Sequence, residues 1–370
     1  MAGRNQDSGR IAALRHALLE WYAQRRRDLP WRRTSDPYAI WISEIMLQQT
    51  RVAAVVERHR EFLARFPTLA SLARADEQEV LALWSGLGYY RRARMLHQAA
   101  QFVAEHCNGN LPATAEELRT LPGIGPYTAA AIASIAHGEC AAVVDGNVER
   151  VLCRLESWEA ASGRAAGALR RRIEAAAARL IDCARPGDWN QAMMELGATV
   201  CVPRNPHCPV CPISAACKTR GEHRTLPRPP MQRREIAHAL VVRRLKRAGK
   251  SGAGAQEVLL EQRPAQLTVM PGLWELPALR QAGVPAPELR MTVRHAIMQV
   301  NYTVRVCDLR EDDVEGMTIH GGKRRWVPVG EAARMALTGL ARKVLGRAGM
   351  LPVAPPAAAG GQRRPHIPEP

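Results

Sequence analysis

Four cysteines lie close together near the middle of the chain. Cys201, Cys208, Cys211 and Cys217 follow the spacing C-x6-C-x2-C-x5-C, with four prolines and few apolar residues between them. A loop of this composition cannot bury a core of its own, so its thiolates indicate a metal or cluster site. Zinc sites of four cysteines usually carry two C-x2-C pairs, and this loop has one. The pattern favours a [4Fe–4S] cluster held by all four thiolates, with zinc or unliganded thiols as alternatives.

The other cysteines are scattered singly, and the chain shows no secretory or membrane signal. The N-terminus has no apolar h-region, and no stretch of about 18 apolar residues occurs. We therefore expect a cytoplasmic protein whose remaining cysteines are free thiols rather than disulfides. They are Cys107, Cys140, Cys153, Cys183 and Cys307.

Glu44 is a candidate proton donor. It lies in the segment WISEIMLQQT, which has helical periodicity. A helix would place Ile40, Trp41, Leu47 and Gln48 beside it, none of them basic. An apolar environment disfavours the charged carboxylate, so the pKa of Glu44 should rise towards neutrality, as a general acid requires. The alternative is an ordinary glutamate at the boundary of the core.

Asp145 is a candidate for the opposite role. It follows the apolar run AAVV and begins the helical segment DGNVERVLCRL. A helix N-terminus stabilises an anion, although an aspartate there is also an ordinary N-cap. One protonated and one ionised carboxyl form the pair that cleavage of an N-glycosidic bond needs. The first protonates the leaving base, and the second stabilises the developing oxocarbenium ion.

Residues 118–138 read as a helix, a tight turn and a second helix. Gly123 and Gly125 would allow positive φ in the turn, and Pro126 suits the first position of a helix. Exposed amides at such a helix start bind a DNA phosphate, so we predict a helix-hairpin-helix. A dinucleotide-binding turn is the alternative, but it needs a preceding strand and a third glycine, and Thr128 occupies that place.

The periodicity of the chain changes once along its length. Apolar positions three and four apart, including a long run over 37–66, predict an all-α domain over residues 10–222. A basic, proline-containing linker follows at 223–234. Alternating segments and one helix predict an α+β domain over 235–347, and the proline-, alanine- and glycine-rich tail 348–370 is predicted to be disordered.

The net charge favours a polyanionic partner. The formal charge is +17 at pH 7, which points first to nucleic acid. A genome composition that favours arginine would also produce this balance.

Several separate motifs resemble one enzyme family. The segments LPWR, SEIMLQQT, GLGYY, LPGIGPYTA, VVDGNVERVL and MELGATVC, with the cysteine loop, are similar to the adenine DNA glycosylases of the MutY family. This family belongs to the endonuclease III superfamily, and the likeness covers roughly residues 20–220. It implies a multidomain protein with a helix-hairpin-helix glycosylase domain, an iron–sulfur loop and a Nudix-like α+β domain. It also implies a monomer that excises adenine paired with 8-oxoguanine or guanine in duplex DNA.

The resemblance implies a role for individual residues. Glu44 would protonate the adenine, Asp145 would stabilise the sugar cation or form a transient adduct, Tyr127 would support that intermediate, and Asn147 would orient the site. The implied substrate-binding residues are Trp31, Arg32 and Glu195 in the adenine pocket, Gln49 and Tyr89 as wedges in the duplex, Thr50 and Leu87 near the opposing base, and Gly123 and Gly125 at a phosphate. For Gln49 and Tyr89 the alternative is ordinary packing.

The absence of lysine distinguishes two kinds of chemistry. The endonuclease III branch uses a lysine after the hairpin to form a Schiff base and cut the backbone. Tyr127 stands at that position, and residues 1–217 contain no lysine. A phenol cannot form an imine, so the sequence predicts a monofunctional glycosylase.

The second domain departs from the family pattern at one loop. No R-E-x-x-E-E helix follows GLWELP, so the Nudix-like domain is predicted to bind rather than hydrolyse. Where the family reads Phe-Ser-His, this chain has Ile297, Met298 and Gln299. Met298 cannot hydrogen-bond as a serine does, so we expect 8-oxoguanine to be recognised by backbone amides, by Gln299 or by another contact, or to be recognised more weakly. Two other functions stay open: a DNA-binding protein without activity, and an oxidoreductase that uses the cluster.

Overall fold

The computed structural model describes residues 2–159, 161–222, 230–244, 256–280, 288–314, 318–319 and 322–351. The chain divides into two compact units. Unit 1 comprises Met1–Gln49, His59–Arg74 and Met95–Arg228, and unit 2 comprises Thr50–Arg58, Ala75–Arg94 and Pro229–Pro370. Among the described residues, none of the helices is both long and apolar enough to cross a membrane.

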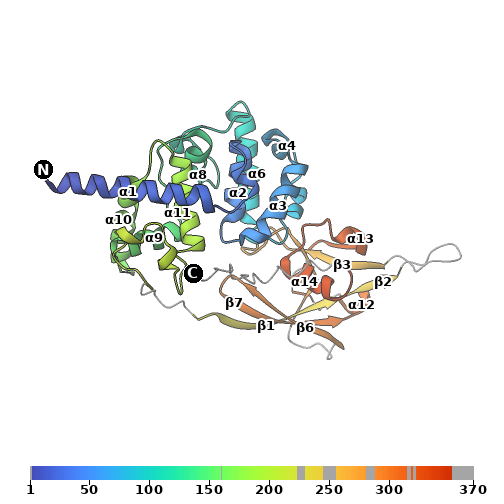
Figure 1. Cartoon of the computed structure of the whole chain (residues 1–370). Helices are drawn as coiled ribbons and strands as arrows, with labels where there is room; N and C mark the ends of the chain where they lie inside the picture. Colours follow the sequence, from blue (N-terminus) through green and yellow to red (C-terminus); the bar gives the residue numbers. More distant parts are fainter. Residues whose placement is uncertain are drawn as a thin grey trace. The chain divides into compact units, whose positions relative to one another are not determined.

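Among the described residues up to 222, all the regular secondary structure is helical (Figure 1). The α-helices are α1 (Ala2–Arg25), α2 (Pro37–Leu47), α3 (Val52–Arg65), α4 (Leu69–Ala73), α5 (Glu77–Leu83), α6 (Arg91–His106), α7 (Ala115–Leu118), α8 (Pro126–His137), α9 (Gly146–Glu156), α10 (Arg164–Leu180) and α11 (Pro186–Thr199). Three short 3-10 helices accompany them: η1 (Pro30–Arg32), η2 (Cys208–Val210) and η3 (Ser214–Ala216).

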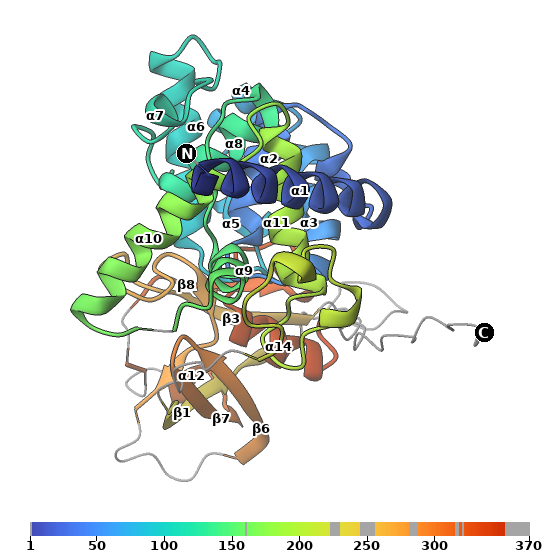
Figure 2. The same cartoon turned by 60° about the vertical axis from the view of Figure 1, so that its left-hand side comes forward.

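Helix α11 is central to the packing of unit 1. It contacts α1, α8 and α9, while α2 packs on α8, and Figure 2 shows α1 running across α11. Two glycines of α11 allow this close approach: a Cβ on Gly187 would lie 2.8 Å from the Ser134 carbonyl oxygen, and one on Gly197 would lie 2.6 Å from Asn147 Cβ. The helices that carry the predicted site residues are therefore packed directly on one another.

Two local predictions for the helices are wrong. The helical run expected over 37–66 is interrupted between α2 and α3, where Gln49 adopts a left-handed φ of 56°. In the hairpin, Gly123 has a φ of 75°, but Gly125 has a φ of −88° and caps α8. Gly123 is the glycine that the turn needs, because a Cβ there would also lie 2.5 Å from Met95 Cβ.

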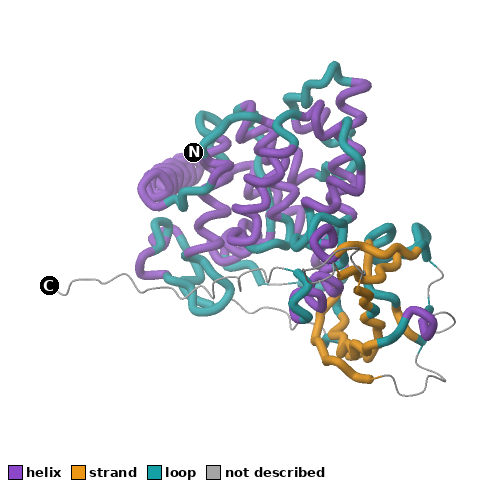
Figure 3. The backbone as a smooth tube through the Cα atoms, turned by 90° about the vertical axis from the view of Figure 1, so that its right-hand side faces the viewer, coloured by secondary structure: helices purple, strands orange, loops and turns teal. Residues whose placement is uncertain are grey.

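All strands of the described chain lie in its C-terminal part (Figure 3). One sheet has the order β5-β1-β7-β6, and the other has β2-β3-β4 with β8 paired to β3. The strands are β1 (Gln232–Leu240), β2 (Val242–Arg244), β3 (Gln256–Gln262), β4 (Trp274–Glu275), β5 (Ala278–Leu279), β6 (Glu288–Ile297), β7 (Val300–Asp308) and β8 (Arg324–Pro328); the helices are α12 (Glu311–Val314), α13 (Val329–Ala332) and α14 (Gly339–Arg347).

Unit 2 combines this α+β region with two helical segments. Strands β1 and β7 are parallel, and α14 packs its buried Leu340, Val344 and Leu345 into the core of the sheets. The Tyr90 hydroxyl donates to the Leu337 carbonyl at 3.0 Å, and Arg342 Nε donates to Ser85 Oγ at 2.8 Å. Residues from the predicted helical domain therefore belong to the second unit.

The edges of the predicted domains are only partly described. Strand β1 starts at Gln232, within the segment that we predicted as linker, and residues 223–229 lie outside the described part of the chain. Of the predicted disordered tail, residues 352–370 also lie outside it, while Leu351 packs against the core of the sheets.

Candidate active site

Glu44 lies on α2 and meets Tyr127 from the start of α8. Glu44 is buried, and the Tyr127 hydroxyl donates to its Oε2 at 2.8 Å. Burial raises the pKa of Glu44 to about 7, and the charge of Asp145 adds to this effect, whereas the Tyr127 hydrogen bond and Arg32 oppose it. Two helices distant in sequence therefore bring together an acid that holds a proton near neutral pH and a phenol that contacts it.

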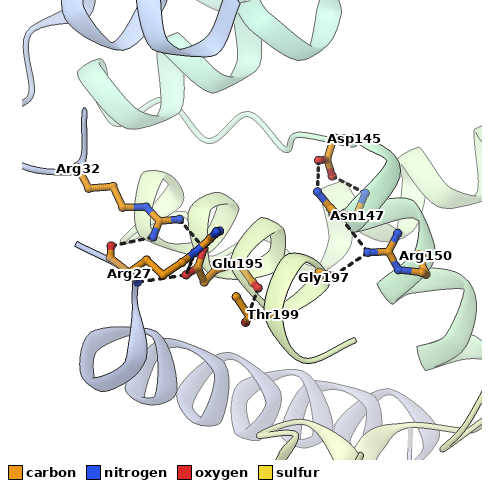
Figure 4. Close-up of polar contacts among 8 residues, drawn as sticks. All are labelled: Arg27, Arg32, Asp145, Asn147, Arg150, Glu195, Gly197 and Thr199. Carbon is orange, nitrogen blue, oxygen red and sulfur yellow. Dashed lines mark hydrogen bonds and ion pairs between the residues drawn. The ribbon is translucent and has the colours of Figure 1, made fainter. Parts of the chain in front are cut away.

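Asp145 caps α9 and is held from two directions (Figure 4). Its Oδ1 accepts from the backbone amides of Asn147 and Val148 at 2.9 and 2.7 Å, and its Oδ2 accepts from Asn147 Nδ2 at 2.8 Å. Both Glu44 and Tyr127 experience the charge of Asp145. Asp145 is thus an N-cap, and its charge also raises the pKa of the predicted acid Glu44.

Arg150 extends these contacts from Asp145 towards the cysteine loop. Its Nη2 donates to Asn147 Oδ1 at 2.8 Å and to the Gly197 carbonyl at 2.7 Å, as Figure 4 shows. Its Nε donates to the Cys201 carbonyl at 2.8 Å. Sequence reasoning missed Arg150, although it lies one helical turn after Asn147. One side chain therefore joins the residue that orients Asp145 to the first cysteine of the loop.

Glu195 on α11 is buried but ionised (Figure 4). Arg27 binds it through Nε and Nη2 at 2.7 Å, and Arg32 Nη2 donates to it at 2.8 Å. Burial alone would raise the pKa of Glu195, but the hydrogen bonds and charges of the two arginines outweigh burial and hold the pKa at about 2. Arg27 was not predicted; the basic run RRRDLPWRR around it was the available signal.

Trp31 lies beside these arginines in η1 and is almost fully buried. Its ring meets the ring of His59 edge-on, with centroids 5.4 Å apart. His59 Nε2 is 3.1 Å from the Ala39 carbonyl, and burial lowers the pKa of His59. The buried histidine therefore supports Trp31 as a neutral ring.

In unit 2, Arg92 gathers three of the predicted DNA-binding residues. Its Nη2 donates to Thr50 Oγ1 at 3.1 Å and to the Leu87 carbonyl at 3.3 Å, and its guanidinium lies 5.3 Å from the Tyr89 ring centroid. Tyr89 has a φ of 49°, as unusual for a side-chain-bearing residue as the φ of Gln49. Both predicted wedge residues are exposed and held in a strained backbone conformation.

The predicted phosphate and lesion contacts are exposed. Gly123 and Gly125 lie on the surface in the turn before α8, and no side chain caps the start of that helix. Met298 and Gln299 form the turn between β6 and β7; Met298 is 72% exposed and has a φ of 53°. These residues are accessible to a large partner.

The four cysteines of the loop line one cavity together with Arg154 and Arg220. Arg154 Nη1 lies 3.3 Å from Cys201 Sγ, and its buried Nε has no partner among the described residues. Within the same part of the chain, no group of three His, Cys, Asp or Glu side chains is arranged to hold a single metal ion. Four thiols and a buried guanidinium therefore surround one cavity.

Two of the scattered cysteines are not free, contrary to our expectation. Cys140 and Cys183 form a disulfide with Cα atoms 4.9 Å apart. A sequence separation of 43 residues gave no signal for this pairing, because it depends on how the loop after α8 meets the turn before α11. Cys107, Cys153 and Cys307 are free thiols, as expected.

The chain is similar to known DNA repair proteins. Residues 42–175 match the family model described as HhH-GPD superfamily base excision DNA repair protein. The chain is 36% identical to the adenine DNA glycosylase of Mus musculus, covering 91% of this chain and 78% of that protein. It is 48% identical to the adenine DNA glycosylase of Homo sapiens over 58% of this chain and 41% of that protein.

Coverage of the relatives is uneven. The chain spans only 42% of the length of the relative from Rattus norvegicus and 47% of that from Arabidopsis thaliana. The solved structure of a thermostable thymine-DNA glycosylase superposes with a TM-score of 0.51 at 28% identity, over 58% of this chain and 98% of that one. Because the chain covers more than three quarters of the mouse protein at 36% identity, it belongs to the adenine DNA glycosylase family.

Proposed function

We propose that the protein excises adenine paired with 8-oxoguanine or guanine in duplex DNA, by hydrolysis of the N-glycosidic bond. The observation that carries this proposal is the buried Glu44, whose pKa is about 7, in contact with Tyr127 and within the electrostatic reach of Asp145. The relatives that support the choice of base are named adenine DNA glycosylases.

The two carboxyls divide the reaction between them. Protonated Glu44 donates its proton to a ring nitrogen of the flipped adenine, so the electron pair of the C1′–N bond leaves with a neutral base. Ionised Asp145 faces the sugar cation that develops, and stabilises it directly or as a transient adduct. Water then adds at C1′ and gives one proton to the Glu44 carboxylate, which restores the acid. The Asn147 amide and the α9 amides keep the Asp145 carboxylate oriented throughout.

The reaction stops at base loss. Tyr127 occupies the place where a lyase would need an amine, and its phenol is already a donor to Glu44. We expect strand breaks at the product site only after hot alkali. A protein–DNA adduct trapped by borohydride would contradict this part of the proposal.

The remaining site residues position the duplex. Extruding a base leaves a gap in the stack, which an inserted side chain must fill. Gln49 and Tyr89 suit this role because both are exposed and fixed by their backbone conformation. Trp31 and the Arg32–Glu195 pair would line the pocket that receives the adenine.

The cysteine loop would hold a [4Fe–4S] cluster through Cys201, Cys208, Cys211 and Cys217. When bound, such a cluster cross-links the loop and is structural rather than hydrolytic. Arg154 would place a positive charge beside the Cys201 ligand, and Arg150 fixes the carbonyl of the same cysteine. The loop would thereby support the start of α9 and present Arg204, Lys218 and Arg220 to DNA phosphates.

The α+β region of unit 2 would serve as a Nudix-like reader of 8-oxoguanine. The exposed β6–β7 turn is the candidate contact, with Gln299 as the side chain that can form hydrogen bonds and Met298 as an apolar one. Faster excision opposite 8-oxoguanine than opposite guanine would support this role. Equal rates would leave the region without a reading function.

One excision assay tests the proposed function. Single-turnover base release is measured on duplexes with adenine opposite 8-oxoguanine, using wild-type protein, Glu44→Gln and Asp145→Asn. We expect release by the wild type and near-complete loss in both variants, with DNA binding retained. Binding without release in all three proteins would favour a non-enzymatic DNA-binding protein.

A further inference from the structure

The disulfide between Cys140 and Cys183 lies outside the machinery described so far. Both residues are exposed to solvent, unlike the buried Cys153 and Cys307. The pair is also separate from the four cysteines of the loop, which are free and half-buried. An exposed disulfide is accessible to small thiols, so its oxidation state follows that of the surrounding solution.

The disulfide joins the segment that leads to Asp145 to the turn that leads to α11. Cys140 belongs to the irregular segment 138–145, which leads from the end of α8 directly to Asp145. Cys183 lies in the turn just before α11, which begins at Pro186. The disulfide therefore fastens the approach to Asp145 onto the start of the helix that carries Glu195.

A second contact fastens the same segment to the same helix. The buried side chain of Asn190 on α11 accepts from the Val143 amide at 3.2 Å and donates to the Ala141 carbonyl at 2.8 Å. The Glu139 carboxylate in addition accepts from the Ala115 amide at 2.6 Å. Without the disulfide the segment would keep these hydrogen bonds but lose its covalent link to the turn before α11.

We propose that Cys140 and Cys183 are a reversible oxidation site that sets how firmly the segment 138–145 holds Asp145 for catalysis. This inference rests on the proposed function, because a change in the position of Asp145 would be seen as a change in the rate of base excision. In the oxidised form the covalent tie limits the motions of the segment. In the reduced form the segment samples more conformations, and Asp145 spends less time facing the sugar.

The exchange can be written with a low-molecular-weight disulfide such as oxidised glutathione as the oxidant. The thiolate of one cysteine attacks a glutathione sulfur, forming a mixed disulfide and releasing one glutathione thiolate. The second cysteine attacks the protein-bound sulfur, forming the Cys140–Cys183 bond and releasing the second glutathione. Two electrons pass from the cysteines to glutathione, and the two cysteine protons end on the two released thiols.

Two other cysteines of the described chain, Cys153 and Cys307, are poorly suited to this exchange. Burial raises the pKa of Cys153 to about 11 and also raises that of Cys307, so both remain protonated and shielded. Thiol titration should therefore report the exposed pair with little background from these two residues.

The test uses the full-length, cluster-containing protein equilibrated in glutathione buffers from strongly reducing to strongly oxidising. Free thiols are alkylated and located by peptide mass spectrometry, and single-turnover excision is measured in the same buffers. We expect Cys140 and Cys183 to lose alkylation together as the buffer becomes oxidising. The excision rate should rise severalfold over the same range.

The double variant Cys140→Ser/Cys183→Ser is the matched control. It should excise at the rate of the reduced wild type in every buffer. Amide hydrogen exchange of residues 138–145 gives a readout independent of catalysis, and exchange should be faster in the reduced protein and in the double variant. Full alkylation of both cysteines in the most oxidising buffer would overturn the oxidation site.

Unchanged exchange and unchanged excision across the titration would overturn the link to Asp145. The same experiment distinguishes failure of the oxidation site from failure of the proposed glycosylase activity. A protein that never releases adenine but shows the paired titration and the change in exchange would retain the oxidation site and refute the glycosylase activity.

Discussion

Two buried glutamates in unit 1 have pKa values shifted in opposite directions. Glu44 is 5% exposed and has a pKa of about 7, whereas Glu195 is 1% exposed and has a pKa of about 2. Burial raises the pKa of both, so burial does not explain the difference. Two guanidinium groups bind Glu195 directly, whereas the Tyr127 hydroxyl donates a hydrogen bond to Glu44. The choice of hydrogen-bond partner, rather than depth, decides which carboxyl carries a proton.

Arg32 connects the two carboxyls. It is paired with Glu195 at 2.8 Å, yet its charge also lowers the pKa of Glu44. A cation bound directly to Glu44 would keep that carboxyl ionised and remove the proton donor. Because Arg32 binds Glu195, it lowers the pKa of Glu44 through its charge alone and does not hold that carboxyl in the ionised form. The comparison therefore predicts that changes at Glu44 reduce the excision rate, whereas changes to the partners of Glu195 reduce stability.

The largest expected effect is on catalysis by Glu44→Gln. The amide keeps the size of the side chain but cannot transfer the proton, so the single-turnover excision rate should fall by about 10²–10⁴-fold. The binding constant for the mispaired duplex is the control and should change little. Excision within tenfold of wild type would show that Glu44 is not the acid.

The next effect is on stability by Arg32→Met. Removing Arg32 leaves the buried Glu195 carboxylate with Arg27 as its remaining cation, and the lost charged hydrogen bond should cost about 1.5–3 kcal/mol in unfolding free energy. Denaturant unfolding measures the change. Arg33→Met is the matched control, because Arg33 pairs with Asp28 at an exposed site and its loss should change stability far less. Equal losses in the two variants would show that burial of the Glu195 pair is unimportant.

The sequence predicted one of these two environments and not the other. The apolar neighbours of Glu44 lie within one helical turn, so periodicity alone indicated a raised pKa. The arginines that bind Glu195 lie 163 and 168 positions away, and only the packing of α1 on α11 brings them together. Local pattern therefore predicts environments that a single element creates, and misses those that two distant elements create.

The same distinction applies to the fold. The helix-hairpin-helix and the change from helices to strands follow local patterns, and both are present in the structure. The parallel pairing of β1 with β7, the Cys140–Cys183 disulfide and the grouping of residues 75–94 with unit 2 depend on contacts between distant segments. The break at Gln49 was also missed, since the residues on both sides of it favour helix.

The contributions of Glu44 and Glu195 to the unfolding free energy should depend on pH in opposite directions. The pKa of Glu44 is raised from 4.5 to about 7, so its contribution is fully present below pH 4.5 and is lost as pH rises to about 7. The pKa of Glu195 is lowered from 4.5 to about 2, so its contribution is present above pH 4.5 and is lost as pH falls to about 2. Each change amounts to about 3 kcal/mol at most.

Unfolding free energies from pH 3 to 8 test this contrast. Compared with wild type, Glu44→Gln should flatten the decline above pH 4.5, and Glu195→Gln should flatten the decline below it. The slopes are compared rather than the absolute values, because Glu195→Gln also leaves two arginines without a charged partner. The same slope change in both variants would mean that the two carboxyls do not differ as described.

The smallest expected effect is a shift in the pH dependence of excision by Tyr127→Phe. The wild-type rate should fall above about pH 7, as Glu44 loses its proton. The Tyr127 hydrogen bond lowers the pKa of Glu44, so removing the hydroxyl should move this decline to higher pH, by less than about one unit. Met194→Leu is the matched control, because Met194 Sδ also contacts the Tyr127 hydroxyl, at 3.2 Å, and its loss leaves the bond to Glu44 intact. If the fall in excision rate moved to lower pH in Tyr127→Phe, the hydroxyl would be raising the pKa of Glu44. Hydrogen-bond donors lower the pKa of Glu195, so this result would contradict our explanation of the difference between the two glutamates.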